Sequence, residues 1–359
     1  MMAVAPSGDV IRALVVEDSI TVRHALREIL GADPELDVIG EACDGAQAIE
    51  LCRQLRPDVI TMDMMLPVLS GLAATEYIMA HFPTPILVVS GSTDRAELFS
   101  TYDALAAGAV DVLDKPRSGA ADLSWGRRLR AAVKMASRIA VITHPRARLG
   151  NATPVAGPAI QPARRLVAIG ASTGGPGAVV SLLRALPAAF TLPILLVQHI
   201  GQPFGAAYAE WLGEQVRRPT RPAVDRQLLC QLTGQVVIAP PGQHLRVQGG
   251  RIRLTLDEER HSCRPSVDVL FESLAQDCGP DVAACLLTGM GRDGAAGLLS
   301  LRQAGAHTFA QDEASSVVYG MPHQARLLGA AQEILPPEAI GRRLGQLVTA
   351  VRALAGGAW

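Results

Sequence analysis

A single serine lies between glycines at a spacing that suits nucleophilic chemistry. Gly170, Ser172 and Gly174 follow the pattern G-x-S-x-G, directly after the apolar run 166–169. A strand, a sharp turn and a helix over 178–186 would lift the serine hydroxyl above a sheet edge, beside the free N–H groups that begin the helix. The turn could instead cradle a phosphate or be purely structural, although the dinucleotide and Walker patterns are both absent.

Two further residues could complete a catalytic group with this serine. His199 follows one apolar run, and Asp293 lies in a glycine-rich loop after another. If each run is a parallel strand, all three residues stand at the carboxyl edge of one sheet. Serine needs a base, and the base needs an acid that fixes its tautomer. We therefore predict Ser172 as nucleophile, His199 as base and Asp293 as its partner. The backbone N–H of Met290 is the predicted oxyanion donor.

A second group of polar residues lies in the first third of the chain. The residues that directly follow apolar runs there are Glu17, Asp18, Asp63, Ser90 and Lys115. Three carboxylates at one sheet edge repel each other unless a cation lies between them, and such oxygen-rich sites suit Mg²⁺. The lysine would balance the charge of an incoming phosphoryl group, and the serine would hydrogen-bond to it. A single aspartate after a strand is usually a cap, so the prediction depends on all five occurring together.

The elements that must position these residues are predicted from the hydrophobic pattern. Short apolar runs alternate with amphipathic helices in both halves, which is typical of doubly wound α/β domains. The expected strands are 11–16, 37–42, 58–62, 86–89 and 110–113 in the first half, and 166–169, 192–197, 235–239, 282–287 and 307–310 in the second. The runs 245–247 and 252–256, separated by two glycines, predict a β-hairpin.

The length of 359 residues favours two domains. We predict a first domain over 10–130, a helix extension with a proline- and arginine-rich linker over 131–163, and a second domain over 164–354. The linker is recognised by its four prolines and by the loss of any hydrophobic period.

Composition excludes several classes of protein. The chain is 49% hydrophobic and 19% charged with a net charge of −1, so both halves can bury a core and no basic surface for nucleic acid is expected. No segment suits a signal peptide or a membrane span. The six cysteines match no zinc pattern, and we interpret them as reduced and mostly core residues of a cytoplasmic protein.

The first half resembles a response-regulator receiver domain. The stretches that carry the resemblance are VEDS at 16–19, DVITMDMMLP at 58–67, SGS at 90–92 and DKP at 114–116. The resemblance implies a flavodoxin-like fold in which Asp63 accepts a phosphoryl group from a histidine kinase. The Mg²⁺ ligands that it implies are Glu17, Asp18, Asp63 and the backbone carbonyl of Met65. The groups that it implies for contact with the phosphate are Ser90 and Lys115.

The second half resembles the catalytic domain of the chemotaxis protein-glutamate methylesterases, the CheB family. The matching stretches are GASTGGP at 170–176, QH at 198–199, APPGQHL at 239–245, RPSVD at 264–268, LTGMGRDG at 287–294 and AQDE at 310–313. The resemblance implies a Rossmann-like parallel sheet and a serine esterase that needs no cofactor. Its implied substrates are glutamate γ-methyl esters on the cytoplasmic helices of chemoreceptors, with release of methanol. Deamidation of receptor glutamines is implied as well.

The two resemblances together imply a gated enzyme. In that family the unphosphorylated receiver covers the catalytic face, and phosphorylation of Asp63 loosens this cover. One alternative is a receiver-controlled adaptor that docks on receptors without turnover, and another is a nucleotide-binding effector. The intact set of Ser172, His199 and Asp293 argues against the adaptor. The missing phosphate and ribose signatures argue against the nucleotide binder.

Overall fold

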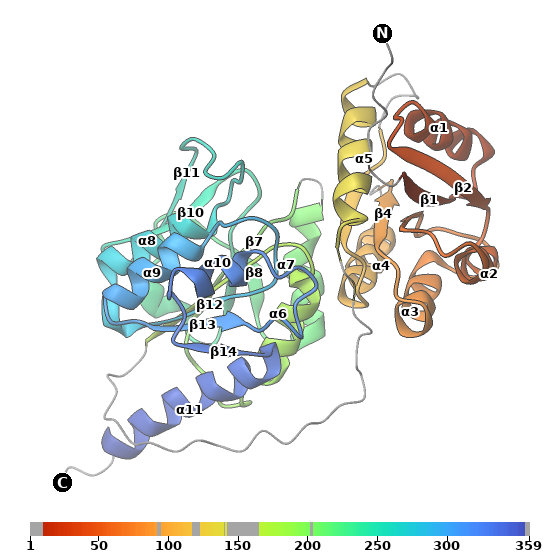
Figure 1. The fold of residues 1–359 in the computed structure, drawn as a ribbon. Helices are drawn as coiled ribbons and strands as arrows, with labels where there is room; N and C mark the ends of the chain where they lie inside the picture. The colour runs from red at the N-terminus through yellow and green to blue at the C-terminus, as the bar shows by residue number, and fades with distance from the viewer. Residues whose placement is uncertain are drawn as a thin grey trace. The chain divides into compact units, whose positions relative to one another are not determined.

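The computed structural model describes residues 10–91, 95–116, 123–139, 141, 165–201 and 204–355. The chain divides into two compact units, Met1–Pro145 and Arg146–Trp359, each with its own sheet (Figure 1). Most of the linker predicted over 131–163 lies outside the described residues. No helix among the described residues is both long enough and apolar enough to cross a bilayer.

The first unit is a five-stranded parallel sheet with the strand order β2-β1-β3-β4-β5. Its strands are β1 (Ile11–Val16), β2 (Leu36–Ala42), β3 (Val59–Met62), β4 (Ile86–Ser90) and β5 (Asp111–Asp114). Its helices are α1 (Ile20–Gly31), α2 (Gly45–Leu55), α3 (Gly71–His81), α4 (Arg95–Ala106) and α5 (Leu123–Ala136). This strand order is the flavodoxin-like order, which confirms the predicted fold of this half.

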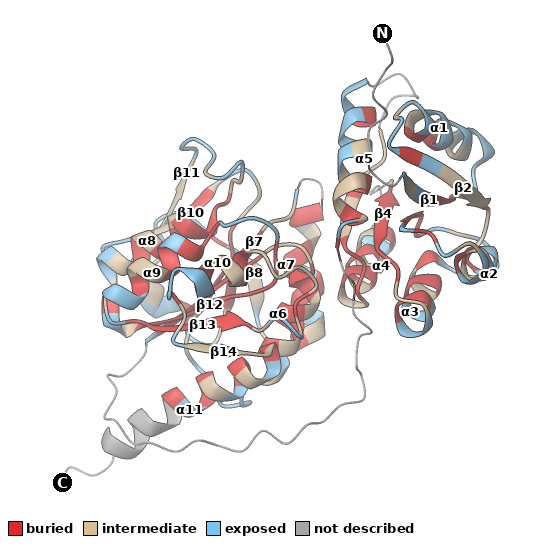
Figure 2. Cartoon of the chain, in the orientation of Figure 1, coloured by how far each residue is buried: buried red, intermediate tan, exposed pale blue. Residues whose placement is uncertain are grey.

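Local chemistry explains where these elements begin and why they are buried. Ser19, Asp44 and Ser70 each accept a backbone N–H at the start of α1, α2 and α3, as helix-capping residues do. The strands β3 and β4 are buried along their whole length, because helices cover both faces of a parallel sheet. Figure 2 shows this buried layer in red within each unit.

The second unit has a seven-stranded parallel sheet in the order β14-β13-β12-β6-β7-β9-β8, and a separate hairpin β10-β11. The strands are β6 (Leu166–Ala171), β7 (Ile194–Gln198), β8 (Thr220–Pro222), β9 (Val236–Ile238), β10 (His244–Gln248), β11 (Arg251–Thr255), β12 (Val282–Leu286), β13 (His307–Gln311) and β14 (Glu333–Leu335). The helices are α6 (Gly175–Arg184), α7 (Phe204–Val216), α8 (Val267–Asp277), α9 (Ala295–Gln303), α10 (Met321–Leu327) and α11 (Pro337–Ala355).

The position of β6 defines a functional edge in this sheet. The chain starts at β6, moves outward to β7 and β9, and then crosses over to β12 on the other side. Read from β9, the order is the Rossmann-like 3-2-1-4-5-6, as predicted, with its switch point between β6 and β12. Ligands of open α/β sheets bind at such a point, beyond the carboxyl ends of the strands.

Several elements were not predicted from the sequence. These are β8, β14, α7, α10 and α11. The helix extension predicted at the start of the 131–163 segment reaches only Ala136, where α5 ends. The prediction of mostly core cysteines is wrong. Cys52 and Cys285 are buried, Cys43, Cys263 and Cys278 are partly exposed, and Cys230 is exposed.

Candidate active site

The ends of three neighbouring strands meet at the switch point of the second unit. Ala171 at the end of β6 pairs with Gln198 at the end of β7, so Ser172 and His199 are the next residue on each strand. The backbone N–H of His199 donates to the carbonyl of Ala171 over 2.9 Å, which extends the pairing by one step. Asp293 enters from the loop that follows β12, on the other side of β6. The three predicted residues therefore come from three adjacent strands.

His199 and Asp293 form a direct contact. His199 Nε2 donates to Asp293 Oδ2 over 2.9 Å, and the two side chains are only 13% and 3% exposed. The same carboxylate accepts Ser266 Oγ at 2.7 Å, Val267 N–H at 2.7 Å and Asp268 N–H at 3.0 Å. These last groups begin α8, and a helix N-terminus favours a negative charge.

The environment of Asp293 keeps it ionised. Burial acts to raise the pKa of its carboxyl group, but the hydrogen bonds from His199, Ser266 and Asp268 outweigh burial and hold the pKa below its ordinary value. The charged carboxylate orients the ring of His199 with Nε2–H toward Asp293 and leaves Nδ1 as the nitrogen that can exchange a proton with substrate.

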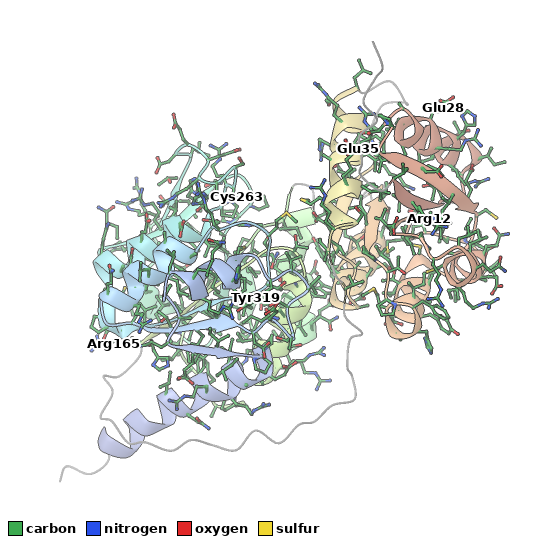
Figure 3. The ribbon with its side chains drawn as sticks, viewed as in Figure 1. Arg12, Glu28, Glu35, Arg165, Cys263 and Tyr319 are labelled. Carbon is green, nitrogen blue, oxygen red and sulfur yellow. The ribbon has the colours of Figure 1, made fainter. Side chains whose placement is uncertain are left out.

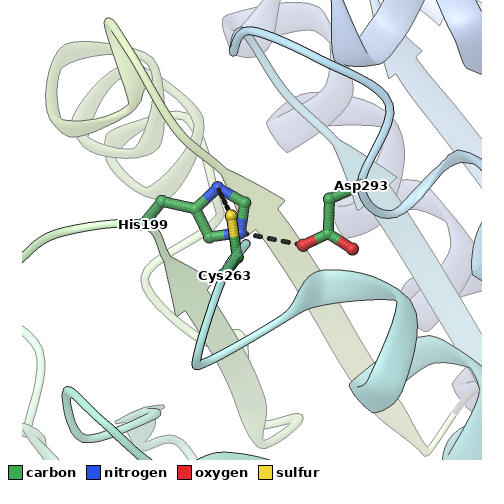
Figure 4. A group of neighbouring side chains, drawn as sticks. All are labelled: His199, Cys263 and Asp293. Carbon is green, nitrogen blue, oxygen red and sulfur yellow. Dashed lines mark hydrogen bonds and ion pairs between the residues drawn. The ribbon is translucent and has the colours of Figure 1, made fainter. Parts of the chain in front are cut away.

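The other ring nitrogen of His199 faces a cysteine. Cys263 Sγ lies 3.8 Å from His199 Nδ1, so the ring has Asp293 on one nitrogen and sulfur beside the other (Figure 4). Burial acts to lower the pKa of His199, but the contacts with Asp293 and Cys263 together raise it to about 9. Sequence reasoning missed this contact, because the two residues are 64 positions apart and the cysteine was interpreted as a core residue.

Ser172 is held by its backbone. Its N–H donates to the carbonyl of Thr288 over 3.0 Å, and its own carbonyl accepts Gln198 Nε2 at 2.9 Å. Within the described residues, Ser172 Oγ makes no hydrogen bond to His199. Catalytic hydrogen bonds of this kind are often loose without substrate and tighten when substrate binds. The structure thus joins two of the three predicted residues directly and places the serine at the neighbouring strand end.

Glycines allow the loops of this edge to pack closely. Gly174 has φ +74° at the start of α6, and a Cβ there would lie 2.4 Å from Val317. A Cβ on Gly289 would lie 2.6 Å from Ser172 Cβ and 2.4 Å from Met321 Sδ. The serine turn therefore packs against the loops that follow β12 and β13 at positions where only glycine fits.

Thr288, in the loop after β12, connects this loop to the serine turn and to the loop after β13. Its hydroxyl donates to the carbonyl of Thr173 over 3.0 Å and accepts Val318 N–H at 2.9 Å, and its N–H donates to Gln311 Oε1 over 2.8 Å. Met290 lies two residues further along this loop, and its N–H donates to no group among the described residues. The oxyanion role of Met290 stays a prediction.

Two other histidines near the site have different partners. His244 is fully buried, accepts Ser266 N–H on Nδ1 at 3.1 Å and contacts the Glu258 carbonyl at 3.0 Å, so it supports the loop that holds Asp293. His261 Nε2 donates to Asp268 Oδ2 over 2.9 Å. Sequence reasoning did not identify these supports, because no short-range pattern marks them.

The receiver-like unit gathers its predicted charges at one edge. Lys115 Nζ lies 2.9 Å from Glu17 Oε2 and 2.9 Å from Asp63 Oδ2. Oxygen atoms of Glu17, Asp18 and Asp63 lie within 4.8 Å of one another. Burial raises the pKa of Glu17. Burial also acts to lower the pKa of Lys115, but the neighbouring charges of Asp63 and Glu17 outweigh burial and raise the pKa of Lys115. Asp63 Oδ1 is buried and finds no hydrogen-bond donor in the described residues, so this all-oxygen cluster fits a cation such as Mg²⁺.

Ser90 has a partner that the sequence did not predict. Its hydroxyl donates to Glu97 Oε1 over 2.6 Å, and Gly91 N–H donates to the same oxygen over 2.6 Å. The hydroxyl predicted to contact a phosphate is thus engaged with α4 in this state. The backbone carbonyl of Met65, whose residue is 55% exposed, stays a predicted Mg²⁺ ligand.

Comparisons with known proteins agree with both halves. Residues 167–344 match the family model described as CheB methylesterase, and residues 13–123 match that of the response regulator receiver domain. A protein of Nitrosospira multiformis named protein-glutamate methylesterase/protein-glutamine glutaminase is 45% identical over 347 residues, which are 94% of this chain and 97% of the relative. A protein of Anaeromyxobacter dehalogenans named protein-glutamate methylesterase/protein-glutamine glutaminase 3 is 46% identical over 340 residues, 93% of this chain and 98% of the relative.

Solved structures give partial matches. The catalytic domain of the Thermotoga maritima CheB methylesterase is 32% identical, covers 52% of this chain and 100% of its own length, and superposes with a TM-score of 0.49.

Proposed function

The chain belongs to the CheB methylesterase family with a response-regulator receiver domain, and from that premise we propose that it is a phosphorylation-activated serine esterase. Its proposed substrates are glutamate γ-methyl esters of chemoreceptors, and its role is in chemotaxis adaptation in the cytoplasm. The observation that carries this proposal is the buried pair of His199 and Asp293, 2.9 Å apart, at the strand end next to Ser172.

The proposed reaction uses the asymmetry of the imidazole. Because Asp293 holds Nε2–H, the nitrogen left to take the serine proton is Nδ1. Ser172 Oγ attacks the ester carbonyl, and the N–H of Met290 stabilises the oxyanion. His199 returns the proton to the methoxy group as methanol leaves. Water then attacks the acyl-enzyme by the same steps, with His199 again as the base, and frees the glutamate carboxylate.

Deamidation of receptor glutamines would follow the same steps. An amide replaces the ester, and ammonia leaves where methanol would leave. The names of the relatives include protein-glutamine glutaminase, which supports this second activity.

The receiver unit would supply the control. We propose that Asp63 accepts the phosphoryl group from a histidine kinase, and that the Mg²⁺ ligands are Glu17, Asp18, Asp63 and the carbonyl of Met65. When bound, the ion neutralises charge on the transferring phosphoryl group. Lys115 already lies beside Asp63 and would pair with the phosphate oxygens. Ser90 would join it after leaving Glu97.

Methanol release from methylated chemoreceptor fragments tests the enzymatic proposal. We expect turnover by the full chain and its loss, by at least about a thousandfold, in Ser172→Ala. Ser181→Ala is the matched control, because Ser181 lies on α6 outside the site and its loss should leave turnover intact. A full chain that binds receptor fragments but releases no methanol in any form would contradict the esterase and leave the adaptor.

A further inference from the structure

We propose that His199, Cys263 and Asp293 form a zinc-binding site, and that zinc bound there blocks the esterase. One ring nitrogen, the thiol sulfur and one carboxylate oxygen of these residues lie within 4.8 Å of one another (Figure 4). The metal-binding part of this inference depends on geometry alone. The inhibitory part rests on the proposed function, because it requires His199 to act as the base.

The spacing of the donor atoms is close to that of a zinc site. Zinc binds sulfur at about 2.3 Å, nitrogen at about 2.0–2.1 Å and carboxylate oxygen at about 2.0–2.2 Å, so tetrahedral ligand atoms lie about 3.2–3.7 Å apart. In the structure His199 Nε2 and Asp293 Oδ2 are 2.9 Å apart, whereas Cys263 Sγ lies 3.8 Å from the opposite ring nitrogen, Nδ1, and within 4.8 Å of the nitrogen that belongs to the cluster. Side-chain shifts of about 1 Å would complete the geometry of a three-ligand site.

Binding exchanges protons for metal. With His199 protonated on both ring nitrogens, the ion would take the place of the Nε2 proton while Nδ1 keeps its own, and the thiol of Cys263 would lose its proton as sulfur coordinates. Two protons therefore leave as one Zn²⁺ enters, and the fourth coordination position stays open to water. Zinc on the imidazole and its carboxylate partner removes the base that Ser172 needs, which explains the expected inhibition.

The loop that carries Cys263 keeps the sulfur near the ring and accessible. Cys263 lies between β11 and α8 and is partly exposed (Figure 3). Arg260 forms paired backbone hydrogen bonds with Cys263, and its guanidinium donates to Glu272 over 2.7 Å. The loop is thereby anchored to α8, the helix whose first N–H groups hold the Asp293 carboxylate. An ion from solvent meets ligands that are already positioned.

The donor set separates this site from the receiver cluster. Sulfur and imidazole nitrogen select zinc, whereas the oxygen donors of Glu17, Asp18 and Asp63 suit Mg²⁺. Among the described residues, Cys263 is the one cysteine that belongs to a potential metal cluster. Excess Mg²⁺ should therefore fill the receiver cluster without competing at the esterase site.

Cobalt(II) titration of the full chain in excess Mg²⁺ tests the site. Cobalt adopts zinc geometries, and a thiolate ligand gives it a charge-transfer band in the near ultraviolet. We expect this band in the wild type and its removal by stoichiometric zinc. The band should be lost in Cys263→Ser and kept in Cys230→Ser, the matched control at an exposed cysteine. Ser172→Ala should also keep the band, because the serine is not a ligand.

Zinc inhibition of methanol release is the second readout. The zinc concentration for half-inhibition, measured against each variant's own metal-free rate, should rise at least about tenfold in Cys263→Ser and stay unchanged in Cys230→Ser. A cobalt band that survives in Cys263→Ser, or no thiolate band in the wild type, would overturn the inference. If neither the wild type nor any variant releases methanol, but Ser172→Ala still gives the cobalt band, the metal site is upheld and the esterase proposal is overturned instead. Cys263→Ala also lacks the sulfur ligand. Its circular dichroism shows whether the variant is folded, so that loss of the cobalt band through misfolding can be told apart from loss of the ligand.

Discussion

At the scale of the residue, the protonation of His199 decides when the site can work. The ring is a base only in its neutral form, and its contacts with Asp293 and Cys263 raise its pKa to about 9. A proton therefore stays on both nitrogens at neutral pH in this state. Substrate or loop movement that separates the ring from the sulfur would free Nδ1.

The pH dependence of kcat/KM follows from this shift. Because the base form increases as the pH rises through the pKa, we expect kcat/KM to climb from pH 6.5 through a midpoint near 9. Methanol release measured across this pH range, with a chelator present, gives the pH of half-maximal kcat/KM. Cys263→Ala removes one of the groups that raise the pKa, so its midpoint should move below that of the wild type. A wild-type midpoint near 6.5 would contradict the argument.

Ser266 should act as a positioning residue for Asp293. Its hydroxyl donates to Asp293 Oδ1 over 2.7 Å in a fully buried setting. Ser266→Ala should cost about 1.5–3 kcal/mol of unfolding free energy and lower kcat about tenfold with little change in KM. Ser273→Ala is the control. Ser273 is a buried serine on α8, and its hydroxyl accepts Val247 N–H and donates to the carbonyl of Leu270, so it makes no contact with Asp293. Equal losses of kcat in both variants would show a merely structural role.

At the scale of the element, the contact between two loops sets the position of the nucleophile. Gly289 lies against Ser172, and a Cβ there would approach Ser172 Cβ to 2.6 Å. We expect Gly289→Ala to lower kcat at least about tenfold while the far-ultraviolet circular dichroism is kept. Gly201→Ala is the matched control, because an added Cβ there meets nothing within 4 Å. Unchanged kcat in Gly289→Ala would show that the loops adjust freely.

The junction of β4 and α4 should set how easily the receiver is phosphorylated. Ser90 must leave Glu97 before it can bind a phosphate, and a charged acceptor holds a hydroxyl more strongly than a neutral amide does. Glu97→Gln should therefore raise the phosphorylated fraction reached with a small phosphodonor and Mg²⁺, as measured by intact mass. Glu76→Gln, at an exposed position of α3, should match the wild type. A fraction that falls in Glu97→Gln would contradict this account.

Elements with continuous apolar runs were predictable from the sequence, and elements that depend on their neighbours were not. The strands β1, β3, β6 and β12 are buried along most or all of their length, so their composition identifies them. In contrast, β8 and β14 have three residues each at opposite edges of the sheet, too few to show a period. The helix α11 carries Gly341 and Gly345, which fit against Leu182 and Pro187 and obscure its pattern.

The candidate site divides in the same way. Ser172, His199 and Asp293 could be predicted because each follows a strand, and the fold places strand ends together. Ser266 and Cys263 could not, because their contacts join loops that are distant in sequence. Long-range packing, which no local pattern records, decides these contacts.

At the scale of the whole molecule, the chain joins two units with separate chemistry. One carries the buried carboxylates around Asp63, and the other carries the pair of His199 and Asp293. The similarity to the two relatives described above extends over 94% and 93% of the chain, so it spans both units. We propose that phosphorylation of the first unit raises turnover by the second.

Methanol release measured with and without a small phosphodonor, in Mg²⁺, tests this regulation. The wild type and Asp63→Asn are compared on the same methylated receptor fragments, with Ser172→Ala as the inactive reference. We expect the phosphodonor to raise turnover at least several-fold in the wild type and to leave turnover by Asp63→Asn unchanged. Stimulation of equal size in both proteins, or none in a wild type shown by mass to be phosphorylated, would contradict it.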